Sequence, residues 1–163
     1  MYPSFTIPLT VCVSLLASTA YGQNMASKIT KHFPGKWEYK RADGTRQGTV
    51  EWELVAGGKS VAGKGESDLG KSYVLAGWDP ARDVWIHTSF AENGQYVRLE
   101  VTKCKGDTYH GTVHRVDSNG EPSSSKWKCE IIGQDHFEIT ETTEDAVTVT
   151  HWHRRKEQCL PTT

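Results

Sequence analysis

The chain has 163 residues, and its 19 Lys and Arg side chains are balanced by 20 Asp and Glu side chains. A nearly neutral chain gives no electrostatic basis for binding nucleic acid or a membrane surface. Six Trp, six Tyr and fifteen Gly accompany many Thr and Val residues, a composition that favours β-structure.

The N-terminal segment is the first predicted element. Residues 5–20 are almost uncharged and largely apolar, and small residues close this run before Gln23. The pattern is typical of a cleaved secretory signal, and the run is shorter than the ~20 apolar residues of a membrane span. We therefore predict a signal peptide over residues 1–22 and a single domain over residues 23–163. The protein is expected to be secreted or periplasmic, without membrane insertion after cleavage.

Three cysteines follow the predicted cleavage point, namely Cys104, Cys129 and Cys159. In an exported protein, two of them are expected to form a disulfide and one is left over. The sequence does not choose the pair, and it carries no motif that fixes the oligomeric state.

Alternation of apolar and polar side chains runs along most of the remaining chain. Turn signals such as Asp43-Gly44 and Asn119-Gly120 separate the alternating runs. After a weakly helical segment at residues 24–33, we predict ten strands, near residues 36–41, 47–55, 59–65, 71–78, 84–90, 95–103, 108–116, 125–132, 136–142 and 146–155. Short links make neighbouring strands antiparallel, and such strands either close into a barrel or split into a sandwich.

The stretch "FPGKW", residues 33–37, bears on this choice. A short helix followed by Gly-x-Trp resembles the start of lipocalins and their calycin relatives. In that superfamily the tryptophan plugs the closed end of the barrel, and an Arg or Lys ending the last strand packs over the ring. The resemblance implies structural roles for Gly35, Trp37 and Arg154, with Arg155 beside it. It also implies an all-β fold, an antiparallel up-and-down barrel of eight to ten strands with a short N-terminal helix.

A second likeness involves "YVLAGWDPARDVWIH", residues 73–87. This stretch resembles the mid-chain hairpin of lipocalins, where an aspartate-aromatic turn joins two strands. Its Gly-Trp-Asp-Pro turn is also similar to an uncharacterised family of bacterial exported or cytosolic β-domains with no settled activity. Asp79 and Asp83 are interpreted as caps of this turn, and the later acidic residues Glu138 and Glu141 as part of a solvated edge.

Seven histidines raise the question of a metal site. His110 and His114 share one strand face, but their spacing separates them by ~13 Å. That is too far for one zinc ion with ligand bonds of ~2 Å, and their alternation with Tyr109 and Val113 directs them to solvent. No Gly-x-Ser-x-Gly, Walker loop, His-Glu-x-x-His or Cys-x-x-Cys motif occurs. The sequence therefore predicts no metal site, no cofactor and no catalytic residue, and it favours a protein without enzymatic activity.

Alternation also predicts which side chains face the barrel interior. The inward set is Trp37, Tyr39, Val50, Trp52, Tyr73, Leu75, Val97, Leu99, Val101, Tyr109, Val113, Trp127 and Ile131. His87 and His151 are the histidines whose strand positions allow an inward side chain. Aromatic rings with polar tips among aliphatic residues suit a partly apolar guest and equally a solid core. The predicted ligand-binding residues are Tyr39, Trp52, Tyr73, His87, Leu99, Tyr109, Trp127 and His151.

The leading functional hypothesis is an exported barrel that binds a small, mostly apolar molecule without transforming it. One alternative is a barrel isomerase or hydrolase in which His87 or His151 acts as acid or base beside Tyr73. Another is a haem-binding barrel in which one of these histidines holds the iron. A further alternative is an interaction module of the cell envelope with Trp78 and Trp85 as exposed anchors.

Overall fold

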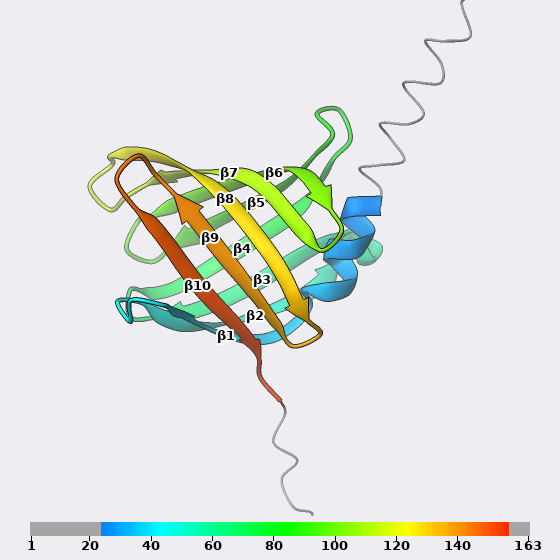
Figure 1. Cartoon of the computed structure of the whole chain (residues 1–163), viewed down its shortest axis with the longest axis horizontal. Helices are drawn as coiled ribbons and strands as arrows, with labels where there is room; N and C mark the ends of the chain where they lie inside the picture. The colour runs from blue at the N-terminus through cyan, green and yellow to red at the C-terminus, as the bar shows by residue number, and fades with distance from the viewer. Residues whose placement is uncertain (1–23, 157–163) are drawn as a thin grey trace, which may run out of the picture.

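The computed structural model describes residues 24–156, which form a closed antiparallel barrel of ten strands and a helix over residues 24–32 (Figure 1). The strands are β1 (Gly35–Arg41), β2 (Gln47–Val55), β3 (Ser60–Ser67), β4 (Gly70–Asp79), β5 (Val84–Ala91), β6 (Tyr96–Lys105), β7 (Thr108–Val116), β8 (Pro122–Gly133), β9 (His136–Thr142) and β10 (Val147–Arg154), with a short 3-10 turn, η1 (Ala56–Gly58), between β2 and β3. The predicted signal peptide over residues 1–22 and Cys159 lie outside the described residues.

Closure of the barrel depends on the pairing of the first strand with the last. β1 pairs antiparallel with β10 as well as with β2, and every other strand pairs with its neighbours in sequence. Because the sheet meets itself, no strand of the barrel leaves an unpaired edge. The predicted up-and-down barrel with a short N-terminal helix is confirmed, and the sandwich arrangement is excluded.

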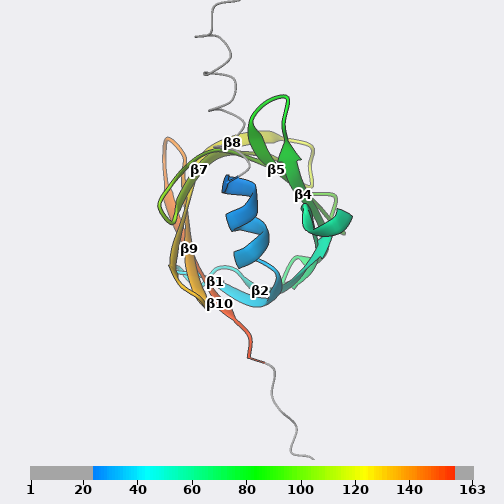
Figure 2. The same cartoon turned by 90° about the vertical axis from the view of Figure 1, so that its right-hand side faces the viewer.

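The N-terminal helix covers one end of the barrel (Figure 2). Its apolar side chains Met25 and Ile29 are buried in the core, and Lys28 Nζ donates a hydrogen bond of 3.0 Å to the carbonyl of Gly106 in the β6–β7 turn. The opposite end is formed by the hairpins that join β1 to β2, β3 to β4, β5 to β6, β7 to β8 and β9 to β10. Among the described residues, no helix is long and apolar enough to cross a membrane.

Trp37 fills the barrel beneath this helix. Its side chain is fully buried, and its Nε1 donates a hydrogen bond of 2.8 Å to the carbonyl of Phe33 at the helix end. The guanidinium carbon of Arg154 lies 4.3 Å from the centre of the Trp37 ring, within the range of a cation–π contact. The structure therefore shows the plug arrangement that the Gly-x-Trp resemblance implies.

Arg154 also connects the last strand to the end of the helix. Its Nη1 and Nη2 donate hydrogen bonds of 2.7 Å to the carbonyls of Pro34 and His32, and its Nε lies 3.2 Å from Asp135 Oδ1. The bond to His32 satisfies a carbonyl that the helix end leaves without a partner, and the bond to Pro34 holds the link from the helix to β1. Gly35 has a φ of +125°, and a Cβ at this position would collide with the Arg154 guanidinium. Glycine is favoured here because this positive φ is strained for other residues, and because the Arg154 guanidinium passes close to the backbone.

The inner face of β4 differs from the predicted one. Val74 and Ala76 face the interior, whereas Tyr73 and Leu75 are 58% and 63% exposed on the outer face. The prediction that Tyr73 and Leu75 point inward is wrong. All four side chains are apolar, so alternation did not distinguish the two faces. The structure buries the smaller pair.

The inner face of β10 is also inverted relative to the prediction. Thr148, Thr150 and Trp152 face the interior, and His151 lies on the outer face, where its Nδ1 is 3.0 Å from Glu138 Oε1. The predicted inward orientation of His151 is therefore wrong. The valines of this strand suggested the opposite face, but the barrel interior near this hairpin is polar and accepts threonine.

The two tryptophans proposed as exposed anchors do not stand out from the surface. Trp85 is only 3% exposed and faces the interior, while Trp78 is half-buried and packs against the buried core. The exposed-anchor interpretation is wrong for Trp85, because β5 turns this ring into the barrel.

Two of the three cysteines in the predicted disulfide set are described. A bulge between Val101 and Lys103 returns Cys104 to the inner side of β6, and Cys129 is fully buried on β8. Cys104 and Cys129 are not joined to each other. A disulfide to Cys159 stays a prediction.

Candidate functional site: an interior cavity

The barrel encloses a cavity of about 530 Å³. Phe33 and Ile29 line it at the helix end, while Arg41, Gln95 and Arg115 line it at the opposite hairpin end. A cavity of this size lies within the ~300–1,000 Å³ range of small-molecule sites. The interior is therefore hollow, and the solid-core alternative does not describe it.

One wall of the cavity is aromatic. The rings of Trp52 and Trp152 stack with centroids 5.4 Å apart, and Phe137 stacks on Trp152 at 5.3 Å. Tyr39 lies 4.6 Å from Trp152 and extends this wall towards the open end. The facing wall, contributed by β3 to β6, is mostly aliphatic and includes Val61, Val74, Ala76, Val97, Leu99 and Val101. An apolar guest between these walls would contact rings on one side and methyl groups on the other.

His87 faces the cavity midway along the barrel, between Ala76 of β4 and Leu99 of β6. Burial lowers the pKa of His87 to about 4, so the imidazole is neutral at neutral pH. Its ring nitrogens make no hydrogen bond with residues 24–156. Burial also raises the pKa of the Tyr109 phenol, which stays protonated. Both groups present polar atoms to the interior without adding charge.

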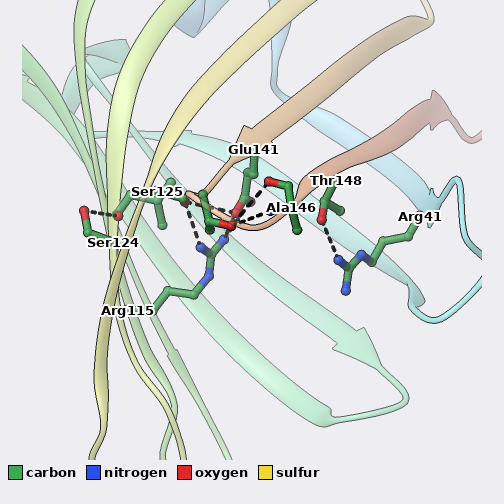
Figure 3. A network of polar contacts seen from close by, with 9 residues as sticks. Arg41, Arg115, Ser124, Ser125, Glu141, Ala146 and Thr148 are labelled. Atoms are coloured by element: carbon green, nitrogen blue, oxygen red, sulfur yellow. Dashed lines mark hydrogen bonds and ion pairs between the residues drawn. The ribbon is translucent and has the colours of Figure 1, made fainter.

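The open end of the cavity is polar and partly charged (Figure 3). Arg115 Nη2 lies 2.6 Å from Glu141 Oε1, and its Nη1 donates to the hydroxyl of Ser125 at 3.3 Å. On the other side of the opening, Arg41 Nη2 donates a hydrogen bond of 2.8 Å to Thr148 Oγ1. Glu141 is thus part of the cavity lining, which corrects its interpretation as a solvated edge.

The lining carries more positive than negative charge. Its ionised side chains are Arg41, Arg46, Arg115 and Glu141, three cations against one anion. Only Arg115 pairs with Glu141. The Nε of Arg41 is buried and makes no hydrogen bond with a described residue, although it lies 3.8 Å from Asp43 Oδ2 in an ion pair. No described residue pairs with the guanidinium of Arg46. The mouth therefore has donor groups available for an acidic or polar group on a guest.

The structure brings together six of the eight residues predicted to bind a ligand. Lining the cavity are Tyr39, Trp52, His87, Leu99, Tyr109 and Trp127. Tyr73 and His151 lie on the outer face, as described above, and cannot contact a guest in this cavity. Ligand contact by the six lining residues stays a prediction.

The arginines of the mouth were missed by sequence analysis, although alternation carried a signal for them. Arg41 lies two residues after Tyr39, and Arg115 lies two residues after Val113, so each shares the inner face of its strand. An arginine on the inner face of a strand interrupts the apolar pattern of a closed core, and it is expected only where the interior opens to solvent. The sequence did not show which barrel end is open.

Comparisons with known proteins give no family for this chain. No protein-family model matches the chain, and the search of curated proteins found no match. A redesigned β-barrel has 15% identity and a TM-score of 0.40 over 78% of this chain and 95% of its own. Another redesigned barrel, mFAP1 with DFHBI bound, has 18% identity and a TM-score of 0.40 over 77% and 97%. A de novo designed fluorescence-activating barrel has 18% identity and a TM-score of 0.37 over 78% and 97%.

Proposed function

We propose that this protein binds a small, mostly apolar molecule with one acidic or polar group inside the barrel, without transforming it. The observation that carries the proposal is the cavity of about 530 Å³, whose walls are apolar and whose mouth holds arginines with unused donor groups. A relationship to calycins is part of the proposal, supported by the contacts of Gly35, Trp37 and Arg154.

The polar gradient along the cavity suggests how a guest is oriented. Its apolar body lies between the aromatic wall near Trp52 and the aliphatic wall near Leu99, and its polar group lies near Arg41 and Arg46. His87, neutral and without a partner among residues 24–156, is placed to donate or accept one hydrogen bond along the body.

Approximate binding free energies show how much the polar groups at the cavity mouth contribute to affinity. Burying eight methylene groups contributes about 6 kcal/mol, of which association itself offsets at least about 4 kcal/mol. The remaining ~2 kcal/mol corresponds to an affinity weaker than millimolar. Two charge-assisted hydrogen bonds from the arginines would add about 3–6 kcal/mol and bring the affinity towards the micromolar range. The head group, rather than the apolar wall alone, decides whether binding is useful.

A fluorescence titration tests the proposal. Anilinonaphthalene sulfonate, an anionic aromatic dye, is expected to quench the cavity tryptophans and to be displaced by a medium-chain fatty acid. The matching alcohol lacks the acidic group and is expected to need about tenfold more ligand, because one charge-assisted bond is worth at least ~1.4 kcal/mol.

Matched variants on β4 locate the binding site. Ala76→Phe fills the cavity because Ala76 faces inward, whereas Leu75→Phe adds a ring to the outer face next to it. Dye binding is expected to be lost in Ala76→Phe and kept in Leu75→Phe. Equal dye binding by both variants, each shown to be folded by its thermal transition, would refute an interior site.

We also infer that the protein is exported. The support is the apolar run at residues 5–20 followed by small residues before Gln23. Mass spectrometry of the protein recovered from the extracellular medium or periplasm is expected to show a chain that begins at Gln23. A chain that keeps Met1 in the cytoplasm would contradict export.

A second candidate function, haem binding, rests on His87 alone. This imidazole is neutral, faces the cavity and has no partner among the described residues, which is the state required of an axial ligand. Addition of haem would then give a Soret band that His87→Ala abolishes. An unchanged band in the variant would exclude His87 as the ligand.

A further inference from the structure

A cluster of histidines and a glutamate lies on the outside of the barrel, away from the cavity. His136 and Glu138 stand two residues apart on β9, and in the register of the sheet they face His153 and His151 of β10. Their sequence neighbours Phe137 and Trp152 point into the cavity, so the cluster occupies the outer face. Two strands thus bring four potential ligands into one patch that no single stretch of sequence contains.

Three of these side chains converge on a common point. His151 Nδ1 lies 3.0 Å from Glu138 Oε1, and His136 Nε2 lies 3.8 Å from the same oxygen. The three ligand atoms all lie within 4.8 Å of one another. Ligands bound to one zinc ion at ~2.1 Å are themselves about 3.4 Å apart in tetrahedral geometry. Small side-chain rotations therefore suffice to place one ion between them.

One ring nitrogen of His136 has no hydrogen-bond partner among the described residues. Its Nε2 is buried and makes no hydrogen bond with any described residue, because 3.8 Å to Glu138 is too long for one. The ring is nonetheless held in place, since it stacks on His153 with centroids 4.4 Å apart and planes 19° apart. An imidazole that is held in place, with a buried nitrogen directed at a carboxylate and no partner among the described residues, is suited to bind a metal ion.

We propose that His136, Glu138 and His151 form a binding site for a divalent transition-metal ion, with zinc as the ion that fits best. Two imidazoles and one carboxylate are a ligand set that zinc accepts, with the remaining positions left to solvent. The proposal is independent of the cavity, because these side chains lie on the other side of the barrel wall.

The charged groups around the cluster are compatible with a bound cation. Glu130 of β8 lies opposite Glu138 in the register, and Lys128 Nζ already pairs with Glu130 at 2.7 Å. Lys40 of β1 lies opposite His151, but its side chain is exposed and extends into solvent on a flexible stem. Glu38 of the same strand faces His153 and adds negative charge on that side.

The site would join β9 to β10 beside the seam where β10 meets β1. An ion that binds the folded barrel and not the unfolded chain raises the apparent stability with the logarithm of its concentration over its Kd. Metal binding at this place is therefore expected to raise the melting temperature, which gives a readout that does not depend on a bound guest.

The test uses the full chain, untagged and treated with a chelator before dialysis. Titration with zinc chloride, followed by calorimetry, is expected to show one ion per chain, and the melting temperature is expected to rise. Glu138→Gln and His151→Gln each remove one ligand and should weaken zinc binding at least tenfold and abolish the rise. His110→Gln is the matched control, because it removes an exposed histidine from the outer face of β7.

Several results would overturn the proposal. It fails if wild-type protein binds no zinc at micromolar concentrations, or if Glu138→Gln and His151→Gln bind as well as the wild type. It also fails if His87→Gln abolishes binding, since the ion would then lie in the cavity. Circular dichroism of each variant confirms the fold. If one ligand variant does not fold, the other still decides the outcome.

Discussion

The two ends of the barrel are built on opposite principles. At the capped end, Trp37 is fully buried with its Nε1 bonded, and the Arg154 guanidinium contacts carbonyls, a carboxylate and the ring at once. At the open end, Arg41 Nε makes no hydrogen bond within residues 24–156 and has only a 3.8 Å ion pair with Asp43, and Arg46 has no ion pair with any described residue. At the capped end, these polar groups bond to other protein groups and close the barrel. The other end keeps donors available, which is where a guest's polar group would bind.

Removal of the Trp37 side chain, which plugs the capped end, should give the largest loss of stability. Trp37→Ala deletes a fully buried indole together with its hydrogen bond and the cation–π contact. We expect the free energy of unfolding to fall by about 3–5 kcal/mol. Urea denaturation measures this change. Leu75→Ala, on the exposed outer face of β4, is the control and should change it by less than about 0.5 kcal/mol. Similar losses in both variants would show that the capped end does not hold the fold.

A fall in pH should cause the second-largest loss of stability, through His87 in the middle of the barrel. The pKa of His87 is about 4 in the folded protein and near 6.5 in the unfolded chain, so only the unfolded chain takes up this proton between those values. Stability is therefore complete above pH 6.5 and falls as pH is lowered towards 4, by up to about 3 kcal/mol.

The half-buried His32 contributes in the same direction, because burial and then the charge of Arg154 lower its pKa. The His87 part is isolated by comparing urea denaturation of the wild type and His87→Gln across this pH range. The variant should show a flatter profile. Parallel profiles would mean that His87 titrates alike in both states.

The sequence predicted the fold because its strongest signals were local. Strand lengths, turn residues and the Gly-x-Trp step each depend on a few adjacent residues, and all ten strands were found close to their observed bounds. The inner face was correct where one face of a strand is clearly more apolar, as in Val97, Leu99 and Val101 of β6.

Prediction of the inner face failed where the interior is not uniformly apolar. On β10, Thr148 and Thr150 face inward and Val147 is 67% exposed, because the cavity mouth is polar. On β4 both faces are apolar, so alternation could not separate Tyr73 from Val74. At the open end of a hollow barrel, polar side chains face the interior and apolar ones can face outward. Which end is open depends on the N-terminal helix, which covers the opposite end.

The outer cluster was missed for a different reason. His136 and Glu138 show the i, i+2 spacing of one strand face, but His151 joins them only through the register of β9 and β10. Strand spacing places histidines of one strand relative to each other, such as His110 and His114, but not histidines of different strands. Cross-strand register is a property of the assembled sheet, so this cluster became visible only with the structure.

The smallest effect is expected at the mouth. Thr148→Val removes the hydroxyl that accepts a hydrogen bond from Arg41 Nη2 and keeps the shape of the side chain. Since the Arg41 head group is near water at the opening, the free energy of unfolding should fall by at most about 1 kcal/mol. Thr150→Val, on the same face of β10 and with no side-chain hydrogen bond among the described residues, is the control and should change it less. Dye affinity should hold or rise in Thr148→Val, because the freed guanidinium gains a donor for the guest. A loss of stability as large as that of Trp37→Ala would show that the mouth is as rigidly built as the cap, and the contrast between the two ends would fail.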